Sequence, residues 1–418
     1  MAGTKGTPPS GIPEESLTDY HIRMAERYGA HNYKPLPVVF REGKGIWLKD
    51  VNGKRYFDML GVYSAASAGH SHPKILDALI QQAQTFAGAS RAAYSDQIWK
   101  PLKMLSELTG LDTFLPMNTG GEGVETALKG IRKYGREVLK VRRPGIVLAE
   151  NFFHGRMLSV VTNSTDSYQS KGYGPKMPGF TLIPFNDLNA LEDAFKKEKN
   201  LVAFMVEPIQ GEAGVIIPDD GYLKGARALC TQYGKLLVLD EVQTGIGRTG
   251  KMFCYEHEGI TPDMLILGKA LGGGLYPVSV VGGTEDVMSV FTPGSHGSTF
   301  GGNPIAMRVA EASLQVTLEE KLPERAAELG PYALEKLREI QSPLVKEVRG
   351  KGLLMALELK EQKAHDIVLK LLQTEPDGIF CKDTHQYNIR FAPPLIITKE
   401  ELDMALHYVK AVFDRYYS

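Results

Sequence analysis

The sequence has few cysteines and no long apolar run. Three of its 418 residues are cysteines, and Cys230, Cys254 and Cys381 lie far apart in the chain. So few cysteines, without close spacing, argue against a disulfide framework or a cysteine metal site, and they are typical of free thiols in a reducing compartment. No apolar stretch approaches the ~20 residues that a membrane-spanning helix needs.

The sequence also lacks an excess of charge of either sign. Its 48 basic and 49 acidic side chains give a formal net charge of −1, which favours neither nucleic acid nor an anionic membrane as a partner. The first 20 residues have neither the apolar core of a secretory signal nor the arginine-rich character of an organellar presequence. We therefore expect a cytoplasmic protein with a short, mobile leader.

Residues 1–63 predict the leader, a helix and a small β-meander. Three short strand-like segments, VVFREG, GIWLKD and KRYFDML, follow the leader. The last two are joined by Val51, Asn52 and Gly53, and Asn-Gly is a strong hairpin signal because both residues tolerate the positive φ of a type I′ turn.

Residues 64–302 alternate apolar runs with helix-like segments. The runs are GIVLAE, LVAFMVEPI, KLLVLDEV, DMLILGKA and PVSVVGG. Runs that are apolar on both faces predict strands buried between helices, hence a large α/β domain with a mostly parallel sheet. Residues 303–418 combine amphipathic helical patterns with the strand candidates KGLLMALELK and NIRFAPPLII. They predict a small α+β domain, completed by the N-terminal segment.

A carboxylate and an amine each follow one of the apolar runs. Asp240 ends KLLVLD and Lys269 follows DMLILG. Ligands of open α/β sheets bind beyond the carboxyl ends of the strands, so both side chains are expected at one crevice. A lysine can form a Schiff base with a pyridoxal phosphate (PLP) aldehyde, and a carboxylate can keep its pyridine nitrogen protonated. A helix N-cap for Asp240 and a solvated Lys269 remain the simpler interpretations.

A glycine-rich helix start provides a candidate phosphate site. Gly120 and Gly121, in PMNTGGEGVETALKG, would point backbone N–H groups and the positive end of a helix dipole at an anion. The alternative is an ordinary helix start with Thr119 as its N-cap. Ser298 and Thr299 of HGSTFGGNP offer hydroxyls that can reach the same phosphate.

The segment ENFFHGRMLS offers groups for the rest of a ligand. Phe153 can stack on an aromatic ring, although it can equally be a core residue, and Arg156 can bind a carboxylate. His70 and His72 of GHSHP have no obvious third ligand nearby, so we assign them structural roles and expect no metal site.

Five motifs carry a family resemblance that extends over nearly the whole chain. In this order, NTGGEGVETALK, VEPIQGEAG, LDEVQTGIGRTG, GKALGGGLYPVS and HGSTFGGNP resemble the class III, fold-type I PLP-dependent aminotransferases. The resemblance implies a seven-stranded large domain and a homodimer with shared active sites. HNYKPLPV, VYSAASAGHSHPKI and IRFAPPLII are most similar to the ornithine δ-aminotransferase group of this class.

The resemblance also implies roles for the cofactor-site residues. Lys269 matches the Schiff-base lysine, Asp240 the partner of the pyridine nitrogen and Phe153 the residue stacked on the ring. Gln243 matches the residue near the ring hydroxyl. Gly120 and Gly121 match the phosphate-binding backbone, and Thr299 matches a phosphate ligand from the other subunit. His154 departs from the tryptophan of some ornithine enzymes.

The substrate side of the site follows from the same resemblance. The implied reaction moves the δ-amino group of L-ornithine to 2-oxoglutarate by ping-pong chemistry, giving glutamate 5-semialdehyde, which cyclises to pyrroline-5-carboxylate, and glutamate. These products would place the enzyme in proline biosynthesis and arginine metabolism.

Arg390 and Arg156 match the two carboxylate-binding arginines, and bidentate guanidinium contacts suit that task. Glu212 can neutralise Arg390 when ornithine is bound. Tyr63 and Tyr33 can bind the substrate's α-amine, or else pack at the domain interface. Acetylornithine or 4-aminobutyrate aminotransferase, a PLP-dependent mutase or racemase, and a non-enzymatic binding module remain as alternatives.

Overall fold

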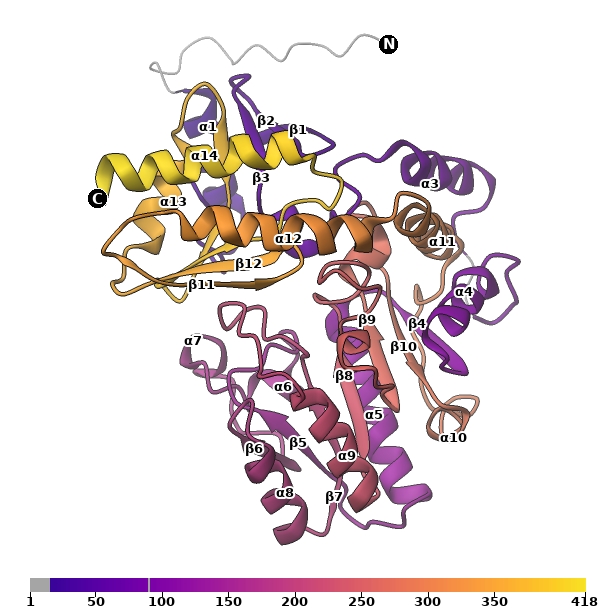
Figure 1. Ribbon diagram of the computed structural model, residues 1–418. Coiled ribbons are helices and arrows are strands. Elements are labelled where there is room, and N and C mark those ends of the chain that lie inside the picture. Colours follow the sequence, from indigo (N-terminus) through magenta and orange to yellow (C-terminus); the bar gives the residue numbers. More distant parts are fainter. Residues whose placement is uncertain (1–15, 89–90) are drawn as a thin grey trace.

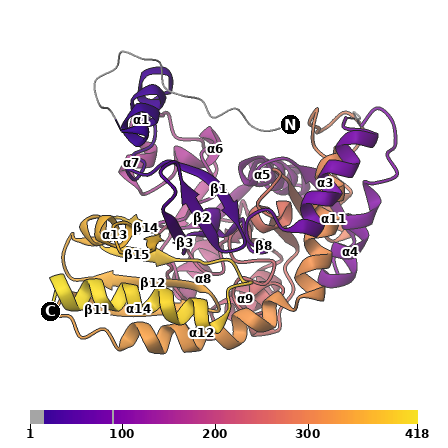
Figure 2. The same ribbon diagram turned by 90° about the horizontal axis from the view of Figure 1, so that it is seen from above.

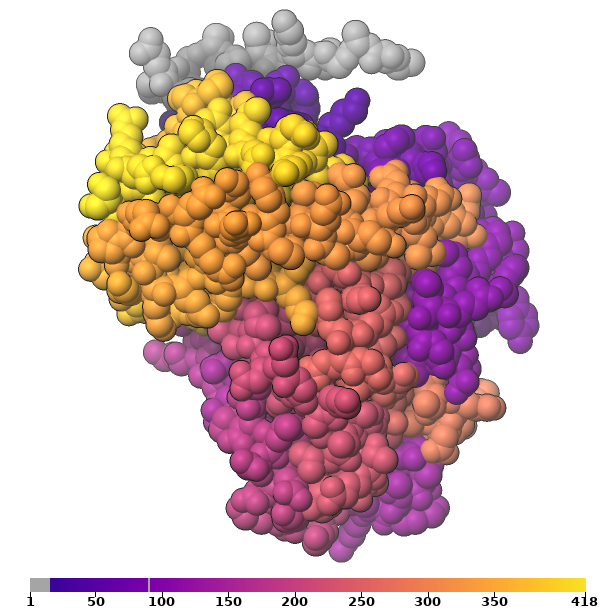
Figure 3. Space-filling view, in the orientation of Figure 1, coloured from indigo at the N-terminus to yellow at the C-terminus, as the bar shows by residue number. Residues whose placement is uncertain are grey.

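A computed structural model describes residues 16–88 and 91–418, which form two lobes (Figure 1). The expected leader falls largely on residues 1–15, outside the described residues. The larger lobe contains one seven-stranded sheet, and the smaller lobe contains two four-stranded sheets. In Figure 3 the C-terminal part of the chain, orange to yellow, covers the upper end of the large lobe.

The large sheet is mostly parallel, as the buried apolar runs predict. Its strands in spatial order are β4 (Thr113–Met117), β10 (Ser279–Gly283), β9 (Met264–Leu267), β8 (Leu236–Asp240), β7 (Leu201–Val206), β5 (Gly145–Ala149) and β6 (Phe180–Ile183). β10 runs antiparallel to both of its neighbours, whereas β9, β8, β7, β5 and β6 are parallel.

Helices bury both faces of this sheet. Alternate residues of β8 belong to two different apolar clusters: Leu237 and Leu239 pack on one side, and Leu236 and Val238 on the other. This two-residue alternation is what a strand covered on both faces requires. One face is covered by α5 (Gly120–Glu137), and the other by α4 (Trp99–Thr109), α8 (Leu188–Lys197), α9 (Tyr222–Tyr233) and α11 (Pro304–Glu319).

Short helical turns complete the large lobe. They are α6 (Leu158–Val161), α7 (Ser167–Ser170), α10 (Glu285–Met288) and the 3₁₀ turns η1 (Cys254–Glu258) and η2 (Lys269–Gly272). Two further elements, α2 (Gly61–Ser64) and α3 (Pro73–Thr85), link the N-terminal strands to this lobe.

The small lobe joins the two ends of the chain. One of its sheets has the order β1 (Phe40–Lys44), β2 (Trp47–Asp50), β3 (Arg55–Asp58) and β13 (Gly378–Phe380), and β13 pairs parallel with β3. The N-terminal segment is therefore completed by the C-terminal region. The other sheet has the order β11 (Val345–Lys351), β12 (Leu354–Leu359), β15 (Asn388–Phe391) and β14 (Lys382–Thr384).

Long helices pack around these small sheets. They are α12 (Leu322–Arg338), α13 (Ala364–Leu372) and α14 (Lys399–Tyr416), and one apolar cluster unites them with β2, β3 and α3. The N-terminal helix α1 (Leu17–Tyr28) lies at the periphery and has no buried residue (Figure 2). No helix in the described ranges is long and apolar enough to cross a membrane. The division of the chain after residues 63 and 302 stays a prediction.

The turn between β2 and β3 corrects one prediction. The two strands form the expected antiparallel hairpin, but only Gly53 has a positive φ, of 94°, and Asn52 does not adopt the left-handed conformation of a type I′ turn. Instead, the Asp50 carboxylate accepts the N–H groups of Asn52 and Lys54, each at 2.9 Å. An aspartate side chain that binds the backbone two residues on supplies its own turn geometry, and this local bond overrides the Asn-Gly preference.

Candidate active site

Asp240 and Lys269 line one cavity, as their places after β8 and β9 predict. Asp240 is the last residue of β8, and Lys269 begins η2, two residues beyond β9. The cavity has a volume of about 200 Å³. Its lining consists of Gly120, Gly121, Val124, Phe153, His154, Gly155, Glu207, Ile209, Glu212, Asp240, Val242, Gln243, Thr244 and Lys269.

The start of α5 forms one wall of this cavity. Thr119 caps the helix: its hydroxyl accepts the N–H of Glu122, and the Glu122 carboxylate accepts the N–H groups of Asn118 and Thr119. The capping box fixes the first turn, so that the N–H groups of Gly120 and Gly121 lie at the positive end of the helix dipole. Thr119 is therefore a helix N-cap, as the alternative to a phosphate site expected. Gly120 and Gly121 nevertheless also line the cavity.

Lys269 lies in an environment that favours its neutral amine. Burial lowers its pKa below the usual 10.5, and the Arg390 guanidinium acts in the same direction. The carboxylates of Glu212, Asp240 and Glu207 oppose this shift without cancelling it. A lysine with a lowered pKa is a better nucleophile and proton acceptor near neutral pH.

Asp240 is held by His154, a contact that the sequence did not predict. His154 Nδ1 donates to Asp240 Oδ2 over 2.7 Å, and the two side chains are 0% and 6% exposed. His154 comes from the loop after β5, and its ring stacks on Phe152. Its position after a buried strand, in the same motif as Phe153, was the available signal.

Glu207 is a second cavity residue that the sequence did not single out. Its carboxylate accepts the N–H of Phe153 at 2.8 Å and the N–H of Gly211 at 3.3 Å. Burial raises its pKa to about 7, and the neighbouring Asp240 adds to the shift, whereas His154 opposes it. Glu207 therefore ties together the two loops that flank the cavity. An acid directly after the apolar run LVAFMV was its sequence signal.

Glu212 and Arg390 form the ion pair that the sequence predicted. Arg390 Nη1 lies 2.6 Å from Glu212 Oε1, and Gln243 Nε2 donates to the same oxygen over 3.3 Å. Burial would raise the pKa of Glu212, but the Arg390 guanidinium, the nearby Lys269 and the hydrogen bonds from Arg390 and Gln243 outweigh it and lower that pKa to about 2. The Arg390 side chain is 1% exposed, and its Nε and Nη2 have no protein partner among the described residues.

The remaining predicted substrate residues, Tyr63, Arg156 and Tyr33, lie in three different surroundings. The Arg390 guanidinium carbon is 5.0 Å from the ring centre of Tyr63, whose backbone is left-handed, with a φ of 54°. The Arg156 guanidinium carbon is 5.4 Å from the ring centre of Phe153, at the cavity wall. Tyr33 is 74% exposed and lines a separate cavity beneath α1.

Ser298 and Thr299 do not line the Lys269 cavity of their own chain. Ser298 Oγ accepts from Asn118 Nδ2 over 3.0 Å, directly before the helix cap, and Thr299 is exposed. His70 and His72 each contact a carboxylate: His70 Nε2 lies 2.6 Å from Asp58 Oδ2, and His72 Nε2 lies 2.9 Å from Glu320 Oε1.

The donor set of the cavity fits pyridoxal phosphate. It combines an amine, a buried carboxylate, a helix N-terminus and an aromatic ring in one space. Within the described part of the chain, Gln243 Oε1 and His154 Nε2 are buried without a hydrogen-bond partner. Buried polar atoms are normally satisfied, so such atoms beside a cavity indicate a polar ligand. Fold and site together define a PLP-dependent enzyme of fold type I.

Comparison with known proteins gives the family. The family model "Aminotransferase class-III" matches residues 28–413. The chain belongs to the class III aminotransferases and is a PLP-dependent transaminase, as the five motifs indicated.

Its relatives include ornithine aminotransferases. The ornithine aminotransferase of Geobacillus sp. (strain WCH70) is 51% identical over 400 residues, which are 95% of this chain and 99% of the relative. A structure of the Toxoplasma gondii ornithine aminotransferase, with partial occupancy of PLP at its active site, is 41% identical with a TM-score of 0.92 and covers 95% of this chain and 94% of that one. The acetylornithine aminotransferase of Elizabethkingia anophelis is 43% identical with a TM-score of 0.88 and covers 96% of this chain and 100% of that one.

Proposed function

We propose that this protein is an ornithine δ-aminotransferase, which moves the δ-amino group of L-ornithine to 2-oxoglutarate. The products are glutamate 5-semialdehyde, which cyclises to pyrroline-5-carboxylate, and glutamate. The observation that carries the proposal is the pair of Glu212 and Arg390 at the cavity that contains Lys269. The similarity to the Geobacillus enzyme, 51% over nearly the whole of both chains, supports the same substrate.

In the proposed site, each cavity residue has one task toward the cofactor. When bound, PLP supplies an electron sink for the carbon that carries the reacting amine. Lys269 would hold the cofactor and then take and return the proton on that carbon, which its lowered pKa favours. Asp240, oriented by His154, would bind the pyridine nitrogen. Phe153 and Gln243 would contact the ring and its hydroxyl, and the N–H groups of Gly120 and Gly121 the phosphate.

The ion pair lets one site accept two different substrates. When ornithine presents its δ-carbon, Arg390 has no carboxylate to bind, and Glu212 neutralises it. When 2-oxoglutarate or glutamate binds, a substrate carboxylate can accept hydrogen bonds from Nε and Nη2 of Arg390, which have no partner among the described residues. Glu212 and Arg390 would thus act as a switch that responds to a carboxylate.

The other predicted residues complete the substrate site in this proposal. Arg156 would bind the distant carboxylate of 2-oxoglutarate, from its place beside Phe153. Tyr63, close to Arg390, would hydrogen-bond the α-amine of ornithine. Tyr33 would reach the same group from the N-terminal segment. The pKa of Tyr63 is raised chiefly by burial, and Glu212 and Tyr33 add to the shift.

We propose a homodimer as the functional unit. Thr299 is exposed and lies outside the cavity of its own chain. This position suits a side chain that binds the cofactor phosphate in the other subunit. Ser298, bonded to Asn118 beside the helix cap, would support the phosphate site. We further propose that the enzyme acts in the cytoplasm, in proline biosynthesis and arginine metabolism.

A comparison of amino donors tests the substrate. The purified enzyme is loaded with PLP and mixed with L-ornithine, acetylornithine, 4-aminobutyrate or glutamate in single turnovers, and the cofactor's visible absorbance is followed. We expect ornithine and glutamate to change the absorbance fastest. Acetylornithine is the second candidate, because the Elizabethkingia acetylornithine enzyme is also similar over 96% of the chain. A clear preference for acetylornithine would refute the proposed substrate and leave the transaminase intact.

A further inference from the structure

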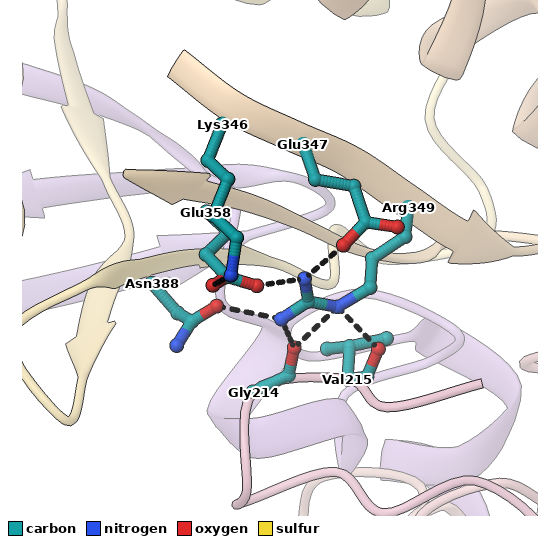
Figure 4. Close-up of polar contacts among 7 residues, drawn as sticks. All are labelled: Gly214, Val215, Lys346, Glu347, Arg349, Glu358 and Asn388. Carbon is teal, nitrogen blue, oxygen red and sulfur yellow. Dashed lines mark hydrogen bonds and ion pairs between the residues drawn. The ribbon is translucent and has the colours of Figure 1, made fainter. Parts of the chain in front are cut away.

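We propose that Arg349 is a specificity-positioning residue, which holds the loop that carries Glu212 and thereby sets the Glu212–Arg390 pair. This inference rests on the proposed function, because it concerns the choice between amino donors. Arg349 lies on β11 of the small lobe, whereas Glu212 lies on a loop that follows β7 of the large lobe. The guanidinium therefore joins the two lobes (Figure 4).

The loop that carries Glu212 is a tight hairpin. Gln210 and Ile216 pair in an antiparallel bridge, and the N–H groups of Gly214 and Val215 both bond to the carbonyl of Gly211. Gly214 has a φ of 115° and Val215 a φ of 57°, a conformation that valine rarely adopts. Such a backbone persists only when its surroundings hold it in place.

Arg349 supplies those surroundings. Its Nε donates to the carbonyls of Gly214 and Val215 over 3.2 and 3.0 Å, and its Nη2 donates to Gly214 O over 2.7 Å. Nη2 also donates to Asn388 Oδ1 over 2.7 Å. The Asn388 amide lies close against Gly214, where an added Cβ would come within 2.8 Å of its Nδ2.

The other side of the guanidinium is held by acids, so it is fixed from two directions. Arg349 Nη1 donates to Glu347 Oε2 over 2.8 Å and to Glu358, and only 10% of the Arg349 side chain is exposed. Glu358 also pairs with Lys346 at 2.5 Å. Figure 4 shows the guanidinium between these acids and the two loop carbonyls.

Strand register places Arg349 and Arg390 in one row of the same sheet. Arg349 pairs with Ala356 of β12, and Ala356 pairs with Arg390 of β15. Directly paired residues of neighbouring strands point to the same face, so the two arginines reach the same loop from one row. Arg349 binds the loop's backbone, and Arg390 binds its Glu212 carboxylate. The sheet therefore fixes both halves of the Glu212–Arg390 pair.

Loss of Arg349 should affect one class of donor. In Arg349→Met the hairpin loosens, Glu212 pairs with Arg390 for less of the time, and Arg390 faces ornithine as an uncompensated cation. We expect the single-turnover rate with ornithine to fall about tenfold relative to the rate with glutamate, because glutamate supplies its own carboxylate. Amide hydrogen exchange at Gly214, Val215 and Ile216 should quicken about tenfold in the cofactor-free protein too.

Lys346→Met is the matched control. It lies on the same strand, shares Glu358 with Arg349, is 58% exposed and has no hydrogen bond to the loop among the described residues. Each single variant leaves Glu358 one cation, so loss of charge at Glu358 is matched, and the two variants differ in the contacts of Arg349 with the loop, Asn388 and Glu347. We expect wild-type exchange and donor ratio from Lys346→Met. If Arg349→Met does not fold, Arg349→Lys replaces it, since lysine keeps the charge and loses the planar fork.

The double variant Glu212→Gln, Arg349→Met decides whether Arg349 acts through Glu212. In the Glu212→Gln background, removal of Arg349 should leave the donor ratio unchanged. Equal losses with both donors, an unchanged ratio, or a loss that persists in this background would overturn the inference. The wild-type donor comparison tests the proposed substrate separately. If acetylornithine proves to be the donor, the ratio is formed with acetylornithine, which also lacks a carboxylate at its reacting end.

Discussion

His154 Nδ1 lies 2.7 Å from Asp240 Oδ2, and both side chains are buried at the wall of the Lys269 cavity. The second carboxylate oxygen, Oδ1, accepts the N–H of Val242 over 3.1 Å. The Asp240 carboxylate is therefore held at both oxygens by groups of the protein itself. Such pre-orientation reduces the reorganisation that accompanies binding and catalysis.

His154→Phe should weaken the site without removing any group that contacts substrate. The variant loses a hydrogen bond to a charged partner, so we expect PLP affinity and kcat each to fall about tenfold. His154→Asn is the control, because its Nδ2 can donate from nearly the position of the imidazole Nδ1. PLP titration and steady-state rates measure both effects. Equal PLP affinity in wild type and His154→Phe would show that the contact has no positioning role.

Lys269→Ala should abolish turnover. No other amine lines the cavity among the described residues, so neither the covalent attachment nor the proton transfer can be replaced. The measurement is the steady-state rate with ornithine and 2-oxoglutarate, with Lys197→Ala as control because Lys197 is 74% exposed and pairs with the surface residue Asp193. Near wild-type turnover by a folded Lys269→Ala protein would refute the assigned role.

Gly211→Ala should disturb the cofactor site through Gln243. A Cβ at position 211 would come within 1.5 Å of Gln243 Oε1, so the amide must leave its place at the cavity wall. Because the clash falls on the end of a flexible side chain, the Gln243 amide can turn away, and loss of its contact should make PLP bind about tenfold more weakly. Gly297→Ala is the control for a PLP titration, because a Cβ at Gly297 meets no atom of the described residues within 4 Å. Unaltered PLP affinity in Gly211→Ala would contradict this placement of Gln243.

The Glu212–Arg390 pair should stabilise the fold in a pH-dependent way. The pKa of Glu212 is about 2 in the folded protein, against the usual 4.5. The unfolded chain therefore binds its proton first, and stability is fully present above pH 4.5 and falls as the pH drops towards 2. Glu212→Gln leaves Arg390 unpaired, so we expect a loss of about 3 kcal/mol near neutral pH.

Urea unfolding of the wild type and Glu212→Gln between about pH 6 and pH 3 measures this dependence. The difference in the free energy of unfolding should be constant down to pH 4.5 and shrink below it. A difference that stays constant down to pH 3 would contradict the lowered pKa.

The sequence predicts the buried strands of the large sheet better than its edges. Five apolar runs correspond to β5, β7, β8, β9 and β10, which are buried along their whole length. β4 and β6 lie at the two edges of the sheet, and several of their residues are only partly buried. A half-exposed edge strand has no continuous apolar pattern, and Pro116 further weakens the signal in β4. Only the family resemblance implied seven strands.

In the site, too, residues that a local pattern marks were predictable, whereas contacts between distant segments were not. Asp240, Lys269, Gly120 and Gly121 were predictable because each follows directly from the end of a strand or the start of a helix. The contacts between His154 and Asp240, 86 residues apart, and between Arg349 and Gly214, 135 residues apart, depend on how separate loops and lobes meet. Local sequence patterns contain no information about such tertiary contacts. Asp50 shows the reverse case, a local side-chain bond that overrides a turn preference.

The parallel pairing of β3 with β13 has a consequence for synthesis of the protein. Lys54 and Glu375, which flank this pairing, form an ion pair across 321 residues of chain. At typical ribosomal rates, roughly 15 to 60 s pass between the synthesis of β3 and the synthesis of its partner strand β13. During that interval the nascent chain presents an open strand edge, to which other chains can pair. A truncation that removes β13 would leave the same edge open permanently, so damage near one end of the chain would make the other end prone to aggregation.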